Sequence, residues 1–291
     1  MLYLAGAIVF SSWLTIAFKI AGRMGISTFQ AIIFNYFTCV ATGLFLDGSV
    51  PDLRSVIGAA WAPWALLMGC MFISIFNLIA YTTRKSGVAI ASVANKLSLV
   101  IPFLFSIFLY NESATILKIT GVFIAIVAVF LTCMPSNSSS GETKIKTGFL
   151  LLPFLLFISS GLLDTLIKYA EVTFINESNH NLYIISSFGT AGIIGASILA
   201  GMLIIGKMPF DPRSIIAGML IGVPNYFSLW CLVRVLKLHA GNSSSIIPIT
   251  NMGIVLLSTL VAALFFQEKL SKLNLLGILL SIMAICMIAF G

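Results

Sequence analysis

The chain carries very little charge. Acidic and basic residues together make up 9% of its 291 positions, whereas soluble globular domains carry about 25%. The formal net charge of +7 does not indicate nucleic-acid binding, because the basic residues flank apolar runs instead of forming a patch. Composition therefore excludes an ordinary soluble domain and predicts an integral membrane protein in contact with lipids, with no nucleic-acid partner.

Residues suited to catalysis or metal binding are also scarce. The two histidines, His180 and His239, lie in or beside expected loops, and the five cysteines show no CxxC or Cys/His spacing. The sequence contains no P-loop motif for nucleotide phosphates. We therefore predict no metal, no cofactor and no direct use of ATP, and we do not expect the protein to be an enzyme.

Long apolar runs fill the rest of the sequence. A transmembrane helix needs about 20 mostly apolar residues, and breaks at charged or Gly/Pro/Ser/Asn-rich stretches leave ten such runs. They are 2–20, 28–46, 62–82, 87–110, 116–134, 148–168, 181–205, 214–235, 243–266 and 273–290. The fold class predicted is an all-α integral membrane protein with ten transmembrane helices.

A polar linker at 135–147 divides the chain into halves at 1–134 and 148–291, and the halves resemble one another. A shift of 156 residues places Asn95 on Asn251 and Glu112 on Glu268 without a gap. A shift of 149 places the stripe formed by Ser11, Thr15 and Lys19 on Ser160, Asp164 and Lys168. Because each half holds five spans, an odd number, the halves cross the membrane in opposite senses. This arrangement is an inverted repeat, which in transporters places the binding site near the midplane.

Basic residues are distributed unequally between the two ends of the spans. Ten of them follow odd-numbered spans and five follow even-numbered spans. Positive charge is enriched in cytoplasmic loops, so the count favours cytoplasmic odd loops and termini on the far side.

The two most specific segments are "FLYNESATILKITGVFIAIVAVFL" and "ALFFQEKLSKLNLLGILLSIMAICM", which both read as an apolar run, Glu, a short polar turn, Gly and an apolar run. With the lysine-terminated "SSWLTIAFKIA" and "SGLLDTLIKYA", they make the chain similar to the drug/metabolite transporter superfamily, specifically its EamA-like members. The resemblance covers essentially the whole chain. It implies a transporter of small organic molecules, often an exporter of amino acids or related metabolites. The family is usually drawn with both termini in the cytoplasm, against the charge count, and Asn35 stands where members often carry a basic residue.

Lys96 and its neighbour Asn95 lie close to the middle of the fourth run. At a rise of 1.5 Å per residue the nearest interface is about 12 Å away, too far for the lysine stem to reach fully. An intramembrane lysine costs about 2.5–3.5 kcal/mol on insertion scales, so it is expected to face a cavity or a partner. One reading is an attractor for a carboxylate or phosphate group of a substrate. The other is a buried ion pair, with Asp164 as the most plausible partner.

Further candidates for substrate binding are amides and indoles within the runs. Amides both donate and accept hydrogen bonds, which suits a zwitterionic or hydroxylated solute, although asparagine also serves as interhelical glue in membranes. Indoles can stack on a substrate or anchor at headgroups. The set comprises Asn251, which repeats Asn95, together with Asn35, Asn77, Asn225, Trp13 and Trp230.

The remaining charged positions admit two readings each. Asp164 is a candidate proton carrier, because desolvation raises a carboxyl pKa, or it pairs with Lys168 one turn away. Lys19 and Lys168 are expected to snorkel to the interface. Glu112 and Glu268, at span ends, are expected to act as structural caps.

Three prolines are candidates for gating because proline removes a backbone hydrogen bond and kinks a helix. Pro102 lies in the fourth run, Pro224 in the eighth and Pro248 in the ninth. Kinks are also ordinary features of membrane helices.

Together these features predict a secondary transporter, an exporter of small polar metabolites such as amino acids or organic anions, working by alternating access through a central cavity. The alternative is a flippase or translocator of a lipid-linked or phosphorylated sugar. The expected location is a bacterial inner membrane, and both a monomer and a homodimer remain open.

Overall fold

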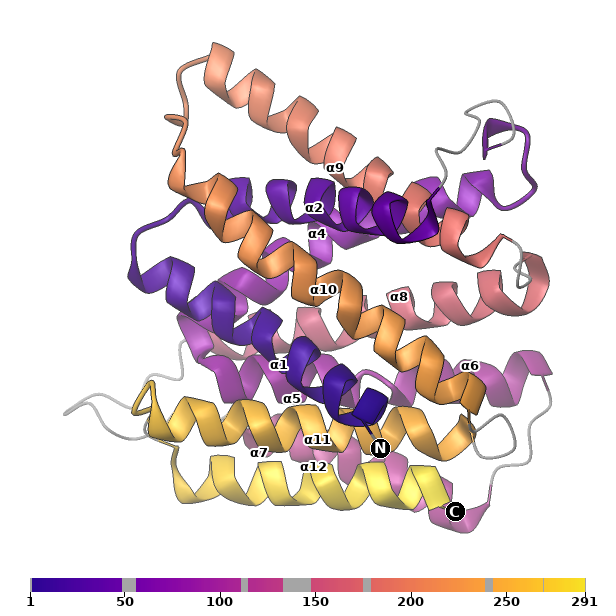
Figure 1. Cartoon of the computed structure of the whole chain (residues 1–291). Coiled ribbons are helices and arrows are strands. Elements are labelled where there is room, and N and C mark those ends of the chain that lie inside the picture. Colours follow the sequence, from indigo (N-terminus) through magenta and orange to yellow (C-terminus); the bar gives the residue numbers. More distant parts are fainter. Residues whose placement is uncertain are drawn as a thin grey trace. The chain divides into compact units, whose positions relative to one another are not determined.

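A computed structural model of the chain describes residues 2–48, 56–110, 115–132, 148–174, 179–238, 243–268 and 270–290. The regular elements in these ranges are all α-helices (Figure 1). In chain order they are α1 (Leu2–Arg23), α2 (Thr28–Asp47), α4 (Ala62–Ser86), α5 (Val88–Leu97), α6 (Val100–Tyr110), α7 (Ile116–Thr132), α8 (Gly148–Phe174), α9 (His180–Ile204), α10 (Arg213–Leu238), α11 (Ser243–Leu264) and α12 (Lys272–Phe290).

Each of the ten apolar runs expected from the sequence coincides with helix. The ends agree within a few residues except in α8, which continues to Phe174. The run 87–110 was expected to form one helix, but it forms two, α5 and α6, which are separated at Ser98 and Leu99.

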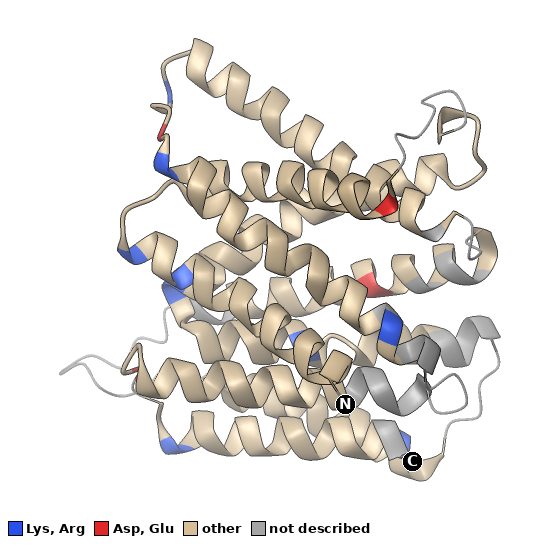
Figure 2. Ribbon diagram, in the orientation of Figure 1, with Lys and Arg blue, Asp and Glu red and all other residues tan. Residues whose placement is uncertain are grey.

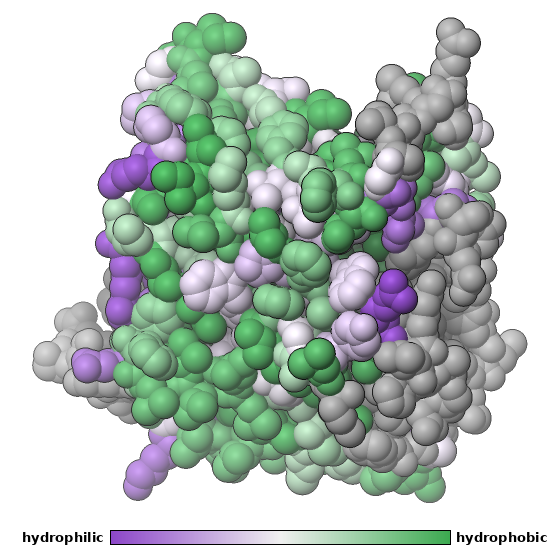
Figure 3. Space-filling view, in the orientation of Figure 1, coloured by the Kyte–Doolittle hydropathy of each residue, from purple (hydrophilic) through white to green (hydrophobic). Residues whose placement is uncertain are grey.

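Within the ranges that the structure describes, six helical segments are long and apolar enough to cross a membrane. Four more apolar segments of 10–17 residues lie at Ile116–Thr132, Leu151–Ile167, Ile249–Leu264 and Lys272–Ile288. Most of the described side chains on the face drawn in Figure 3 are apolar, and large hydrophobic side chains such as Phe45, Phe123 and Leu279 are exposed. Apolar surface on this scale suits lipid and not water. The described chain is thus helical, and its helices have the lengths and the apolar surface that suit a multi-pass membrane protein.

The helices form two compact units. Unit 1 comprises Met1–Lys19, Leu78–Leu162 and Phe227–Gly291, and unit 2 comprises Ile20–Asn77 and Leu163–Tyr226. Each unit therefore contains residues from both sides of the linker at 135–147, and the division into compact units is a different one from the division into sequence halves.

In unit 1, α7 packs along α12 through small residues (Figure 1). A Cβ added to Gly121 would lie 3.0 Å from Ile288 Cγ1 and 3.2 Å from the backbone oxygen of Ala284, so only hydrogen fits comfortably there. Close approach of this kind drives helix association in membranes. At the end of the pair, Asn274 Nδ2 donates to the carbonyl of Thr132 at 2.7 Å and so satisfies a terminal carbonyl of α7.

In unit 2, α2 is the central helix. Tyr36 is fully buried among the rings of Phe72, Phe76 and Phe188, with centroids 5.5–6.4 Å away. On another face of α2, a Cβ at Gly222 of α10 would lie 2.6 Å from Thr38 Cβ and 2.7 Å from the carbonyl oxygen of Asn35. Glycine at this position therefore sets the distance between α10 and α2.

Three helix pairs join equivalent parts of the two sequence halves. The second and seventh runs pair as α2 and α9, the fourth and ninth as α5 and α11, and the fifth and tenth as α7 and α12. These are the runs that the predicted inverted repeat makes equivalent.

Candidate functional site

One end of unit 1 is held together by the carboxylate of Glu268, which lies just after α11. The backbone N–H of Val88, the first residue of α5, donates to Oε1 at 2.9 Å and to Oε2 at 3.0 Å. Lys19 Nζ, near the end of α1, lies 3.2 Å from Oε1 and also donates to the carbonyl of Thr83 at 3.3 Å. Glu268 thus joins α1, the α4–α5 junction and the end of α11. We call this group the Glu268 tie.

The Glu268 tie depends on local features of the sequence. Gly87, directly before α5, has φ +102° and ψ 164°, a conformation that L side chains rarely adopt. A Cβ there would lie 2.7 Å from Glu268 Oε2, so glycine also leaves room for the carboxylate. The start of α5 favours an anion, because the positive end of its helix dipole lies there and its first N–H groups have no partner within the helix.

These contacts bear on two expectations. Lys19 is paired with Glu268, and its side chain is 16% exposed; because Glu268 lies at the end of a predicted span, the snorkelling of Lys19 to the interface stays a prediction. The expected capping role of Glu268 is confirmed, although the helix that it caps is α5 and not its own. Glu112 and the side chain of Lys168 lie outside the described residues.

Lys96 and Asn95 lie at the other end of α5, both half-buried. The helix stops at Leu97 because Pro102 has no N–H to donate to the carbonyl of Ser98, four residues earlier. The N–H of Ile101 donates to that carbonyl instead, at 2.9 Å, which closes a tighter turn before α6 begins. Of the three candidate gating prolines, Pro102 is therefore the one at an actual break.

The other two candidate prolines lie within continuous helix. α10 runs through Pro224 without interruption, and Pro248 lies in the second turn of α11, which also continues past it. The side chain of Pro248 is outside the described set.

Buried hydroxyl groups without a partner accumulate on the helices of the Glu268 tie. Ser12 on α1 is 0% exposed, Ser92 on α5 is 2% exposed and Ser258 on α11 is 0% exposed. None of the three Oγ atoms has a hydrogen-bond partner within the part of the chain that the structure describes. An unpaired buried polar group costs about 1–3 kcal/mol, so native structures rarely leave several together without a reason.

The register of the helices places these groups at similar depth. The Glu268 tie joins the ends of α1 and α11, and Ile8 of α1 lies against Gly253 of α11, so these two helices run parallel. At 1.5 Å per residue, Ser12 lies about 10 Å from Lys19 along its helix, and Ser258 lies about 9 Å from the end of α11. Lys96 lies about 12 Å from the start of α5. That start is bonded to Glu268 and so lies at the same end of unit 1 as Lys19 and the end of α11.

Each helix also presents its polar residues on one face. Ser92 and Lys96 are four residues apart on α5, and Asn251 and Ser258 are seven residues apart on α11. Since α5 packs against α11 and α1 lies against α11, Ser12, Lys96 and Ser258 form a layer of polar residues at similar depth in unit 1, with Ser92, Asn95 and Asn251 elsewhere on α5 and α11. We call it the polar layer. The half-buried Trp13 follows Ser12 directly.

Two candidate asparagines of unit 2 form a pair. Asn225 Nδ2 on α10 donates to Asn35 Oδ1 on α2 at 3.1 Å, and these residues are 3% and 0% exposed. The sulfur of Cys39 lies 3.4 Å from the carbonyl oxygen of Gly222 beside them. The pair therefore links α2 to α10, as expected if these asparagines hold helices together. A contact between either of them and a substrate stays a prediction.

The remaining candidates are dispersed. Asn77 Nδ2 donates to the carbonyl of Ile73 one turn earlier, at 2.6 Å. Trp230 packs edge-on against Tyr3, and the guanidinium of Arg234 lies 5.1 Å from its ring centroid. Asp164 lies on the part of α8 that belongs to unit 2, and its side chain is exposed.

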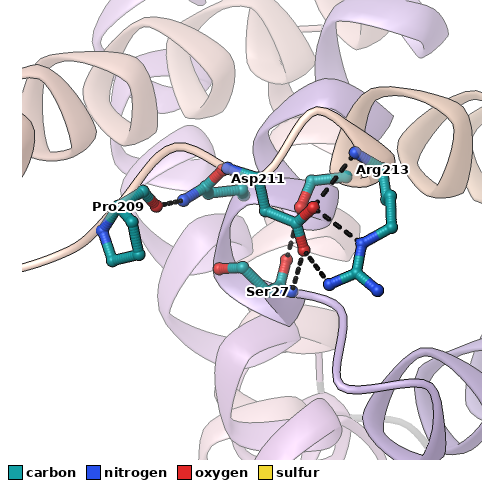
Figure 4. Close-up of polar contacts among 6 residues, drawn as sticks. Ser27, Pro209, Asp211 and Arg213 are labelled. Atoms are coloured by element: carbon teal, nitrogen blue, oxygen red, sulfur yellow. Dashed lines mark hydrogen bonds and ion pairs between the residues drawn. The ribbon is translucent and has the colours of Figure 1, made fainter.

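A second polar cluster lies in unit 2, between the start of α2 and the loop before α10 (Figure 4). Asp211 accepts hydrogen bonds from Arg213 Nε at 3.0 Å and from the Ser27 N–H at 3.4 Å. Gln30 Nε2 donates to the carbonyl of Pro209 at 2.8 Å. Hydrogen bonding from the Arg213 side chain holds the pKa of Asp211 below its usual range. The cluster anchors a loop, and sequence patterns gave no sign of it.

In each unit considered by itself, more of the described Lys and Arg residues lie at one end than at the other (Figure 2). In unit 1 the exposed residues Arg84, Lys85 and Lys272 flank the Glu268 tie, whereas Lys118 at the start of α7 and Arg234 near the end of α10 lie away from it. In unit 2 the described cations at helix ends, Lys207 and Arg213 among them, lie at the end of the Asp211 cluster.

Sequence reasoning missed Gly87, the three serines and the partner of Glu268. A serine at position 12 with threonine and lysine three and seven residues later was a visible signal, because these residues share a helix face. For the contact between Glu268 and Val88, 180 residues apart, no local pattern exists.

Comparisons with known proteins support the fold and leave the activity open. No protein-family model matches the chain. An uncharacterized protein of Haemophilus influenzae (strain ATCC 51907 / DSM 11121 / KW20 / Rd) is 28% identical over 285 residues, which cover 96% of this chain and 94% of that protein. A protein of known crystal structure aligns with 98% of this chain and 94% of its own at a TM-score of 0.61 and 15% identity. At that identity the likeness concerns the fold alone.

Proposed function

We propose that the protein is a secondary transporter that exports small polar metabolites with an anionic group, such as amino acids or organic anions. In this proposal the solute binds at the polar layer of unit 1. Lys96 attracts its anionic group, Asn95 and Asn251 orient it, and the serine hydroxyls complete its hydrogen bonds. Asp164 is the proposed carrier of a coupled proton, and alternating access arises from an inverted repeat.

The observation that carries this proposal is the polar layer itself. Three buried hydroxyls have no hydrogen-bond partner among the described residues, and a half-buried lysine lies at a similar depth in an apolar protein. Another buried serine of unit 1, Ser281, does pair within the protein, with the carbonyl of Ile278 at 2.7 Å. Polar atoms of a solute or of water supply the partners that the protein withholds.

Two further observations support the mechanism. The pairing of the second, fourth and fifth runs with their repeat equivalents fits a twofold relation between the halves, and five spans in each half make that relation an inverted one. The charge at one end of each unit agrees with cytoplasmic loops after the odd-numbered spans. We therefore propose the inner membrane of a bacterium as its location.

The test is the thermal stability of the purified protein in detergent against amino acids, carboxylates, sugar phosphates and neutral sugars. A ligand at about 100 times its Kd stabilises the native state by about 2.7 kcal/mol. We expect one anionic class to raise the apparent Tm of the wild type and of Lys272→Gln, an exposed control, but not of Lys96→Gln. Stabilisation of all three proteins by the same anion would remove Lys96 from the site. A response only to lipid-linked or phosphorylated sugars would favour the flippase alternative.

A further inference from the structure

Helix α5 is a short rigid body with a distinct attachment at each end. It contains ten residues and is therefore about 15 Å long. Its first N–H groups are held by Glu268, and its last residue precedes the break at Ser98 and Leu99. Between these two ends it carries Ser92 and Lys96 on one face.

The two attachments differ in strength and in kind. At the break, the helical hydrogen bond from residue 102 to the carbonyl of Ser98 is missing, because Pro102 has no N–H. Bending between α5 and α6 therefore disrupts few hydrogen bonds. At the Glu268 tie, the contacts are one ion pair and backbone hydrogen bonds to a single carboxylate. One side-chain movement therefore removes these bonds from the N-terminal end of α5, which then keeps its chain connection to α4 and its packing against α11.

We propose that α5 is a lever and that the Glu268 tie is its latch. While the latch is closed, the end of unit 1 that bears Lys19 is shut and the polar layer is sealed from that side. When Glu268 leaves the N–H groups of Val88 and Ala89, α5 turns about Ser98 and Leu99. The movement admits water to Ser92 and Lys96. The proposal builds on the proposed function, since it assigns the closed end of the pathway to named atoms.

The position of the latch makes reversible opening physically reasonable. The side chains of Lys19 and Glu268 are 16% and 13% exposed, so each group is close to solvent and is hydrated as soon as the two separate. A deeply buried pair would instead leave uncompensated charges in an apolar interior, at a much higher cost. Arg84 and Lys85, exposed in the last turn of α4, lie at the same end.

A purely structural cap predicts a different response. Loss of a cap lowers stability everywhere in its cooperative unit, whereas loss of a latch exposes one path from one side of the membrane. The experiment therefore compares accessibility at two buried positions of unit 1. Ser92 lies on the lever, and Ser281, 0% exposed on α12, lies away from it and is the matched control.

The measurement is the rate at which a membrane-impermeant thiol reagent labels Ser92→Cys in vesicles, applied separately to each face. The same chain without the added cysteine gives the contribution of the five native cysteines. We expect Glu268→Gln to accelerate labelling of position 92 by about ten- to a hundredfold from one face only, the shift that loss of a charge-assisted hydrogen bond gives a two-state equilibrium. Lys19→Gln should act in the same direction, and Ser281→Cys should stay protected in both backgrounds.

Equal acceleration at positions 92 and 281, or none at 92, would overturn the lever. If Ser92→Cys does not fold, Ser12→Cys on α1 probes the same path. The readout needs no substrate, so the two proposals fail separately. Labelling at position 92 could accelerate while no metabolite raises the Tm. That result would support the lever and refute the proposed solute class.

Discussion

Replacing Gly87 by alanine tests the structure at its most specific point. The backbone there has φ +102° and ψ 164°, a region nearly restricted to glycine, and an L residue in it costs about 1–3 kcal/mol. The new Cβ would also lie 2.7 Å from Glu268 Oε2, so the carboxylate must leave the N–H of Val88. A hydrogen bond to a charged group contributes about 1.5–3 kcal/mol. The sum is a destabilisation of about 2.5–6 kcal/mol.

The assay separates these two contributions by comparing apparent melting temperatures in detergent. Gly206→Ala is the control, because Gly206 has φ +70° but nothing within 4 Å of its added Cβ, so it reports a left-handed backbone alone, about 1–2 kcal/mol. In a Glu268→Ala background, Gly87→Ala should lose its steric part and cost only about 1–3 kcal/mol. The substitutions at 87 and 268 should therefore be non-additive.

Two results would refute this reasoning. One is a melting temperature for Gly87→Ala no lower than that for Gly206→Ala. The other is full additivity between the substitutions at 87 and 268, which would mean that the carboxylate does not lie over the start of α5.

Three further predictions concern unit 2. Gly222→Leu should destabilise the protein by about 1–3 kcal/mol or more through overpacking against α2, while Gly201→Leu, with open space around its Cβ, should leave the melting temperature nearly unchanged. A double-mutant cycle on Asn35 and Asn225, each changed to alanine, should give a coupling of about 0.6–1.7 kcal/mol if they bond across helices; no coupling would contradict the pair. Asp211 has a pKa lowered by Arg213, so its contacts stabilise the folded chain above the ordinary carboxyl pKa of about 3.9 and are lost as pH falls through the lower folded value. Melting temperatures of Asp211→Asn and wild type should converge at acidic pH, and a constant difference would contradict this assignment.

The positions of the helices could be predicted from the sequence because lipid imposes one strong requirement on the chain. Every backbone polar group in a hydrocarbon layer must be bonded internally, so about 20 apolar residues in a row indicate a helix whatever its neighbours are. This is why the bounds of α2 and α9 agree closely with expectation. The break in the fourth run was indicated only by Pro102, and proline is tolerated in many continuous helices, as α10 shows at Pro224.

The contacts of the charged residues could not be predicted in the same way. Lys19 has a stem long enough to reach the interface, and from its own helix that was the expected course. What its own helix does not reveal is the ion pair with a carboxylate 249 residues later in the sequence, at the end of another helix. Which of two favourable environments a lysine finds depends on tertiary packing, and helix periodicity carries no information about it.

The pairing of equivalent runs has a consequence for biosynthesis. In the pairs α2–α9, α5–α11 and α7–α12, the partners are separated by about 150 residues of chain. At a synthesis rate of about 5–20 residues per second, each early helix waits roughly 8–30 s for the helix that it will pack against. During that interval the side of Tyr36 that Phe188 will cover, and the surface around Gly121, have only lipid or the insertion machinery as neighbours. The first five spans are therefore an unfinished assembly, and the nascent chain completes its packing only as the second five enter the membrane.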